Sequence, residues 1–402
     1  MRCLMKKNLL LLLGLAASAA MLFSGCGKKD SSSDLEVNET LLPVETQDAE
    51  LFPTEKDEAS AEQSQADDMP PREGMARSRL TGEWVDEDVA NTRPIAVMIP
   101  NSKTASYYGL SKAGVLYECN VEATMTRLMA IFEDWEGMDK IGNIRSSRDY
   151  FIYWSFEWDA IYVHFGGPFY IDDLVARKDT QNIDCLSNEA YYFQSPAKND
   201  TDCMFTDGER IQKAMERLEY PKEYRADYAD AQHFLYSADS DPNTLEQYPD
   251  AISAGKVDMS LAYPITNCYF LYNEETGLYD RYQHLSGDVE GPHLDMANNE
   301  QLTFKNLIIQ NTYYEVRDQK GYLAFQCHDT TRDGWYFTNG KGIHVTWEKT
   351  SDYSATRYYD DDGNEIRLNT GKTMICIVED GDSFQVDNKT IISNHNVTQN
   401  KE

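Results

Sequence analysis

An Asn-Gly pair between two alternating apolar segments constrains the fold of this chain more than any other local feature. Asn339-Gly340 separates residues 335–338 from residues 341–347. A two-residue hairpin turn needs positive φ at both central positions, which Asn and Gly adopt at the least cost. The pattern therefore predicts an antiparallel hairpin. The residues that alternate on one face of its second strand are Ile343, Val345 and Trp347.

The residues around this hairpin share its β character. Asp362-Gly363 predicts a second hairpin, between residues 356–359 and 365–368. Apolar runs at 303–310 and 373–378 indicate buried strands. We therefore predict a mostly antiparallel β domain over residues 251–386, followed by a flexible polar tail over 387–402.

The preceding residues, 79–250, mix strand and helix patterns, and we predict an α+β domain there. Helices are predicted where aromatics recur at helical spacing and where Pro or Asp marks a start. The predicted strands are 95–99, 115–122, 127–133 and 160–164, and the predicted helices are 149–158, 168–178 and 207–218. The predicted fold class is therefore α+β, with a mixed domain followed by a β-rich one.

The N-terminus has the pattern of an exported lipoprotein. Basic residues precede an apolar run, 9–23, that is shorter than the about 20 residues of a membrane-spanning helix. The run ends at Gly25-Cys26, so we predict a signal peptide over 1–25 and an acylated Cys26. Acylation would anchor the protein in the lipid bilayer, on the extracytoplasmic face of the cell membrane. The alternative is ordinary secretion with an unmodified Cys26.

Residues 26–78 form an acidic linker. They are rich in Asp, Glu, Ser, Gln and Pro and show no apolar period, so we expect a disordered stalk. The whole chain has 68 acidic and 37 basic residues and a net charge of −31. Nucleic-acid binding depends on basic side chains that displace counterions, and this charge argues against it.

The remaining cysteines leave two alternatives open. An even number in an exported protein permits three disulfides, but no spacing supports a particular pairing. We favour buried thiols, because two of the six lie in strand-like apolar runs. The six are Cys119, Cys185, Cys203, Cys268, Cys327 and Cys376.

The sharpest candidate site is Arg145-Ser146-Ser147-Arg148, directly before the predicted helix at 149–158. A serine could cap that helix. Two arginines beside free backbone N–H groups would suit a carboxylate, phosphate or sulfate. Asn101, Arg127, Gly166 and Gly167 are further candidates for the ligand site. The alternative is that the arginines pair with local acids, namely Glu118, Glu122, Glu133 and Asp134.

His164 is a candidate general base, since it closes a predicted strand and precedes the two glycines. It would need an orienting carboxylate such as Glu122 or Asp172; the alternative is a histidine hydrogen-bonded in the core. Glu118, Glu122 and Glu133 could also form a paired-carboxylate site. No full set of metal ligands and no phosphate-binding loop appears, so we expect neither a metal nor a cofactor.

Five ordered blocks give the chain a family resemblance. It resembles the YerB-like lipoprotein family over nearly all of residues 80–378. The blocks are residues 91–101, 109–118, 126–132, 140–148 and 159–167. The resemblance implies an N-terminal α+β domain and a C-terminal β-rich domain on a lipoprotein stalk. It implies no activity, because the family is largely described as of unknown function.

We expect a binding lipoprotein that captures an anionic small molecule, peptide or envelope component. An envelope hydrolase that uses His164 and Glu122 on glycan or peptide is the alternative, and a structural partner in a membrane-side complex is the third hypothesis. The sequence favours a binding role over an enzyme. It leaves the ligand, the oligomeric state and the relative placement of the two domains open.

Overall fold

A computed structural model describes residues 69–194, 203–228, 232–285 and 287–393. All of them belong to one compact unit. The predicted signal peptide, Cys26, the linker up to residue 68 and the tail from residue 394 lie outside the described residues.

The Asn-Gly hairpin is confirmed. β22 (Asp329–Thr338) and β23 (Lys341–Lys349) pair antiparallel, with Thr338 opposite Lys341. Asn339 and Gly340 both have positive φ, 50° and 70°. The glycine is required for a second reason, because a Cβ there would lie 2.7 Å from the ring of Tyr272.

The second predicted hairpin is only partly correct. Its strands share a single bridge, Tyr359 to Glu365. β24 (Arg357–Tyr359) pairs instead with β23. After the turn, Leu368 bonds to the backbone of Leu235, so the second predicted strand does not continue the hairpin.

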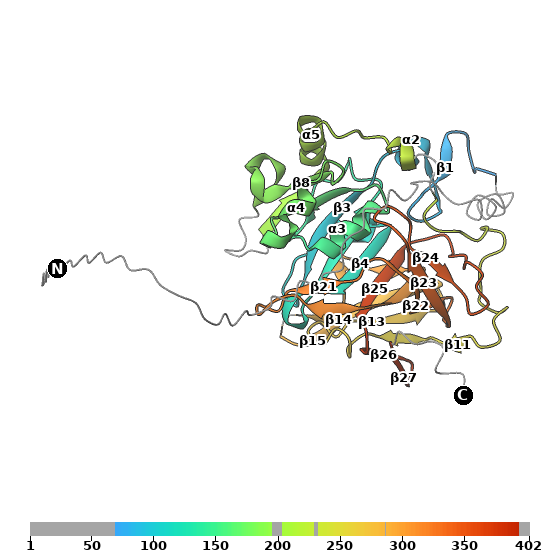
Figure 1. Cartoon of the computed structure of the whole chain (residues 1–402). Coiled ribbons are helices and arrows are strands. Elements are labelled where there is room, and N and C mark those ends of the chain that lie inside the picture. The colour runs from blue at the N-terminus through green and yellow to red at the C-terminus, as the bar shows by residue number, and fades with distance from the viewer. Residues whose placement is uncertain (1–68, 195–202, 229–231, 286, 394–402) are drawn as a thin grey trace, which may run out of the picture. The chain divides into compact units, whose positions relative to one another are not determined.

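Within the described residues, eleven strands form a central sheet (Figure 1). Their order is β11-β23-β22-β19-β25-β4-β5-β3-β7-β8, with β24 beside β23. The bounds not yet given are β3 Ile95–Asn101, β4 Val115–Asn120, β5 Thr126–Phe132, β7 Ile161–His164, β8 Asn182–Asp184, β11 Ile252–Ser253, β19 Asn306–Thr312 and β25 Thr373–Glu379.

This sheet runs through both predicted domains. β4, from the first half of the chain, pairs in parallel with β25, from the second, and Glu118 lies opposite Cys376. β25 also pairs in parallel with β19, so the second half is not purely antiparallel. The apolar runs predict that these strands are buried, but a sequence pattern does not name a strand's neighbours.

A second sheet of seven strands lies within the later half of the described chain. Its strands are β12 Lys256–Asp258, β13 Tyr269–Asn273, β14 Leu278–Leu285, β15 Val289–Pro292, β18 Thr303–Phe304, β26 Ser383–Val386 and β27 Lys389–Ile392. Smaller sheets join β1 (Met75–Arg77) with β2 (Trp84–Asp86), β6 (Ile141–Gly142) with β10 (Met204–Thr206) and β9 (Phe193–Gln194), β16 (Leu294–Asp295) with β17 (Glu300–Gln301), and β20 (Tyr314–Val316) with β21 (Leu323–Phe325).

Two predicted boundaries are wrong. β1 lies inside the predicted disordered linker, where it is held by backbone pairing with β2. β27 lies inside the predicted flexible tail, where residues 389–392 pair with β26. Both strands gain hydrogen bonds from a partner strand, which composition does not reveal.

The helices are few. α3 (Asp149–Phe156) and α5 (Gly208–Leu218) confirm two predictions, and the Asp207 side chain caps α5 by accepting from the Arg210 N–H at 2.8 Å. The predicted helix at 168–178 is wrong beyond its first turns, because it is a 3₁₀ turn followed by α4 (Asp172–Val175). α2 is a single turn, Glu87–Ala90, that the sequence analysis missed.

Apolar clusters cover both faces of the central sheet, and five of the eight residues of α3 belong to one of them. The predicted α+β fold class, mostly β, is confirmed. All six cysteines of the described chain are buried thiols, as predicted. No helix among the described residues is long and apolar enough to cross a bilayer.

His344 on β23 joins two elements of this sheet. Its Nε2 lies 2.7 Å from an oxygen of Asp333 on β22, and its Nδ1 lies 2.6 Å from an oxygen of Asp361 in the neighbouring turn. Burial alone would lower its pKa, but the two carboxylates outweigh burial and raise it above 6.5.

We expect this contact to stabilise the fold below pH 6.5 and to fade as the pH rises through the raised pKa, because the folded state then loses a proton that it holds more tightly. His344→Gln should lower the free energy of unfolding by about 1 kcal/mol at about pH 5.5 and by less at about pH 8.5. Urea unfolding at the two pH values measures the difference. A deficit that stays constant or grows with pH would contradict this assignment.

Candidate functional site

Most of the predicted site residues lie at one edge of the central sheet. β3, β7 and β8 run parallel, so they end on the same side, at Asn101, His164 and Asp184. β5 runs antiparallel and begins beside Asn101, which places Arg127 there too. We call this the carboxyl edge and define it by loops 121–125, 145–148 and 165–168. Loops after parallel strands are a usual place for ligand sites.

Arg148 is held in an ion pair at this edge. Its Nε donates to Oε1 of Glu122 at 2.6 Å, and its Nη2 pairs with the same oxygen. Its Nη1 donates to the carbonyl oxygen of Ser147 at 2.6 Å. The residue is only 5% exposed. Arg148 therefore holds the loop that carries Glu122 in place. Direct contact with an anion would come from the neighbouring arginines, Arg127 and Arg145.

Arg127 and Arg145 are those neighbours, and both are half-buried. Arg127 donates through Nη1 to the carbonyl oxygen of Ser146. Burial lowers the pKa of Arg127 to about 10, and the positive charges of Arg148 and Arg145 add to that shift, while Glu122 opposes it. Three guanidinium groups thus lie within electrostatic reach of one another. Their repulsion raises the free energy of the empty site.

A fourth arginine extends the cluster. Arg317 forms an ion pair with Asp149, the first residue of α3, and lies over the ring of Tyr170 at 4.1 Å. The buried hydroxyl oxygen of Tyr170 has no hydrogen-bond partner among the described residues. Arg148, Asp149, Arg317 and Glu122 all shift the pKa of this phenol, which burial raises. Sequence reasoning missed Arg317 and Tyr170, because no local pattern links them to residues 145–148.

The predicted serine and glycine positions divide in their roles. Arg148 is the N-cap of α3 and no side chain caps that helix, so the predicted serine cap is wrong. Ser147 is fully buried and bonds to the hydroxyl of Tyr162 at 2.9 Å. Gly166 has φ 63°, and its carbonyl accepts from the N–H of Ser147 at 2.9 Å. Gly167 is exposed, and a Cβ there would clash with the Ile171 side chain.

His164 is buried and engaged in hydrogen bonds. Its Nδ1 lies 2.9 Å from the carbonyl oxygen of Gly166, and its Nε2 lies 3.1 Å from Oδ1 of Asn182. The Asp184 carboxylate lies 3.9 Å from Nδ1. Glu122 forms an ion pair with Arg148 and not with His164. Both ring nitrogens of His164 make hydrogen bonds within the fold, which agrees with the alternative of a histidine hydrogen-bonded in the core.

The paired-carboxylate candidates are not brought together. Glu118 is fully buried and pairs with Arg281, Glu122 pairs with Arg148, and Glu133 accepts from the N–H of Arg79 at 3.2 Å. Asn101 belongs with Glu118, to which its Nδ2 donates at 2.6 Å. The described residues contain no group of three or more His, Cys, Asp or Glu side chains placed to hold a metal ion.

Comparison with known proteins bears on the whole fold. Residues 80–221 match the family described as "Protein of unknown function (DUF3048) N-terminal domain", and residues 259–375 match its C-terminal domain. The chain is 25% identical to "Putative lipoprotein YerB" of Bacillus subtilis (strain 168) over 329 residues, which cover 80% of this chain and 92% of the relative. The chain belongs to the YerB-like family.

A solved YerB structure supports the fold of this YerB-like chain. The crystal structure of the YerB protein from Bacillus subtilis superposes with a TM-score of 0.64 at 22% identity. The match covers 75% of this chain and 96% of the solved one. The fold is therefore shared with a known structure over this part of the chain, whereas no activity comes with the comparison.

Proposed function

We propose that this YerB-like lipoprotein is a binding module whose carboxyl edge captures a small anionic ligand or an anionic group of an envelope component. The observation that carries the proposal is the charge at this edge. Four guanidinium groups, those of Arg127, Arg145, Arg148 and Arg317, face the carboxylates of Glu122 and Asp149. This concentration of guanidinium groups occurs in a chain of net charge −31.

The chemistry of the cluster suits an oxyanion. Guanidinium groups present planar pairs of N–H donors that match carboxylate and phosphate oxygens. A bound anion would relieve the repulsion among Arg127, Arg145 and Arg148. The phenol of Tyr170 supplies a hydroxyl that no group in the described part of the chain uses.

The position of the edge fits a lipid-anchored protein. Thr81, close to the start of the described chain, accepts from the N–H of Gly371, just before β25 begins. The described chain therefore starts near the amino-terminal ends of β25 and β4, opposite the carboxyl edge. A stalk acylated at Cys26 would place the arginines on the side away from its attachment. The lipoprotein named among the relatives supports this extracytoplasmic location.

Titration calorimetry with inorganic phosphate tests the proposal. Wild-type protein should bind phosphate, and Arg145→Gln should weaken binding by about tenfold, because one charge-assisted contact is lost. Arg127→Gln should have an equal or larger effect. Arg217→Gln is the matched control, since Arg217 is exposed on α5 and away from the site.

The same experiment separates binding from folding. Thermal unfolding of each variant shows whether the fold is intact. Wild-type protein that binds no phosphate, or a folded Arg145→Gln variant that binds as well as the Arg217→Gln control, would contradict a ligand site at the carboxyl edge.

A further inference from the structure

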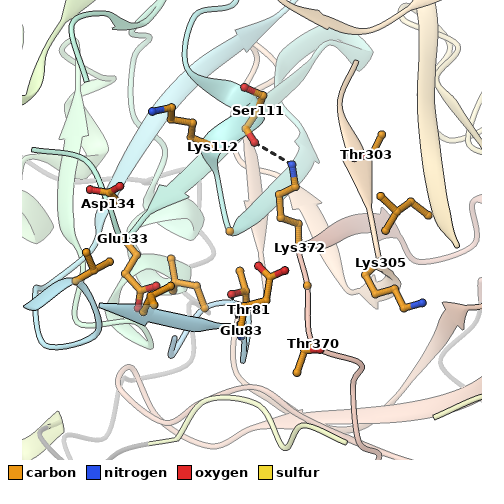
Figure 2. A pocket seen from close by; sticks show the side chains of 16 residues that line it. Thr81, Glu83, Ser111, Lys112, Glu133, Asp134, Thr303, Lys305, Thr370 and Lys372 are labelled. Atoms are coloured by element: carbon orange, nitrogen blue, oxygen red, sulfur yellow. Dashed lines mark hydrogen bonds between the residues drawn. The ribbon is translucent and has the colours of Figure 1, made fainter. Parts of the chain in front are cut away.

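A cavity lies at the opposite edge of the central sheet, near the amino-terminal ends of β4 and β25 (Figure 2). Its volume is about 340 Å³, which falls within the range of small-molecule sites. Its walls come from both halves of the chain, with residues 80–89, 111–114 and 133–134 on one side and 278, 303–305 and 370–372 on the other. Only two of these positions, Glu133 and Asp134, were named as candidate residues from the sequence, and neither was placed in a cavity.

Charged side chains line this cavity without pairing. Six charged residues belong to the lining, and they are Lys112, Lys305, Lys372, Glu83, Glu133 and Asp134. In the described chain none of them comes within ion-pair distance of an opposite charge, although such pairs are common elsewhere in the fold. No counter-charge in the described fold therefore competes with a ligand for these groups, although Glu133 accepts a backbone hydrogen bond from Arg79 and Lys305 donates to Asn339.

Lys372 and Glu83 define the centre of the cavity. Among the described residues Lys372 donates one hydrogen bond, to the carbonyl oxygen of Ser111 at 2.9 Å, and two of its N–H groups stay unused there. Burial lowers the pKa of Lys372, and of the charges that oppose the shift Glu83 has the largest effect. Lys372 and Glu83 thus interact electrostatically across the cavity without forming an ion pair. Figure 2 shows Glu83 beside the stem of Lys372.

The other charges divide between two walls. Glu133 and Asp134 lie together on one side, and burial raises the pKa of Glu133. Lys305 points away and donates to Oδ1 of Asn339 at 2.7 Å, so it frames the cavity. Apolar side chains complete the lining, and they are Leu80, Val85, Val89 and Leu278.

We propose that this cavity binds a small zwitterion, a free amino acid or dipeptide, through its two charged ends. Lys372, with Lys112 at the rim, holds the carboxylate. Glu83, with Glu133 and Asp134 on the same wall, holds the ammonium group. The apolar lining contacts the side chains. This site is separate from the carboxyl edge and does not depend on the function proposed there.

Titration calorimetry with alanyl-alanine tests this site on the folded protein. Alanyl-alanine should bind, and N-acetyl-alanyl-alanine and alanyl-alanine amide, which each lack one charge, should bind at least about tenfold more weakly. Lys372→Met and Glu83→Gln should each weaken binding of alanyl-alanine by about tenfold. Lys389→Met, on the exposed strand β27, is the matched control and should change nothing.

The outcomes are decisive in each direction. Glu83 and Lys112 are exposed, so Glu83→Gln and Lys112→Met should fold even if Lys372→Met does not. Failure of alanyl-alanine to bind, or equal binding of the blocked peptides, would overturn the proposal. Loss of alanyl-alanine binding in Arg145→Gln would also overturn it, because the peptide would then occupy the carboxyl edge.

Discussion

Replacing Arg281 with methionine should lower the free energy of unfolding by about 3–5 kcal/mol, because it leaves a buried carboxylate without its counter-charge. Arg281 on β14 and Glu118 on β4 are both fully buried, and Nη1 lies 2.8 Å from Oε2. Burial alone would lower the pKa of Arg281, but Glu118, together with the thiols of Cys268 and Cys376, outweighs burial and raises it. The pair also joins strands from the two halves of the chain.

Hydrogen bonds from neighbouring side chains hold the Arg281–Glu118 pair in place. Glu118 accepts from Thr126 at 2.7 Å, and Nε of Arg281 donates to Nδ1 of His293 at 2.9 Å. Burial and Arg281 hold the pKa of His293 well below its ordinary value, so the imidazole stays neutral and can accept.

Urea unfolding of Arg281→Met, with Arg217→Met on the surface of α5 as control, measures the effect. Adding Glu118→Gln should recover part of the loss, because it removes the unpaired charge. A loss below about 1 kcal/mol in Arg281→Met would show that the pair contributes little to joining the halves.

Lowering the pH should reduce the free energy of unfolding by a comparable amount, because it protonates Glu157, just after α3. Burial alone would raise the pKa of this carboxyl, but Lys349, His233 and hydrogen bonds from Thr356 lower it from 4.5 to about 2. Glu157 and Lys349 are both fully buried, with Nζ 3.5 Å from Oε2. A carboxyl with a lower pKa in the folded state stabilises the fold above its ordinary pKa, and that stabilisation is lost as the pH falls toward the folded value.

The expected loss between about pH 5 and about pH 2 is about 3 kcal/mol, from the shift between the two states. Free energies of unfolding of the wild type and of Glu157→Gln over this range measure it. The variant should start less stable and fall less steeply, because Gln does not titrate. Parallel curves for the two proteins would contradict the assignment. Lys349→Met should also be strongly destabilising at neutral pH, by about 3 kcal/mol or more.

Local features of this fold were predictable because their causes are local. Asn339-Gly340 specifies its turn through backbone φ, and Asp207 specifies the start of α5 through one hydrogen bond. The parallel pairing of β4 with β25 has no such cause, since it joins segments about 260 residues apart and depends on the packing of both faces. Distance does not explain the missed strands at 75–77 and 389–392, because they pair with the nearby residues 84–86 and 383–386; their polar surroundings hid them.

In the candidate site, too, only the residues with a local sequence signal could be predicted. Arg145 and Arg148 were found because they adjoin a helix start, and the structure brings Arg127 and Glu122 to them. Arg317 reaches the cluster from a distant loop, so no spacing could reveal it. The cavity around Lys372 was missed for the same reason, since its walls are single residues from segments of both halves.

Anomalous diffraction from a crystal soaked in selenate tests the central claim most directly. Selenate has the shape and charge of the oxyanions that the arginine cluster suits, and its position is independent of any assay. The account predicts a selenium peak at the carboxyl edge, within hydrogen-bond distance of Arg127 and Arg145, that disappears in a crystal of Arg145→Gln. A well-soaked crystal with no peak there, or with peaks only at surface lysines, would contradict a function in anion capture.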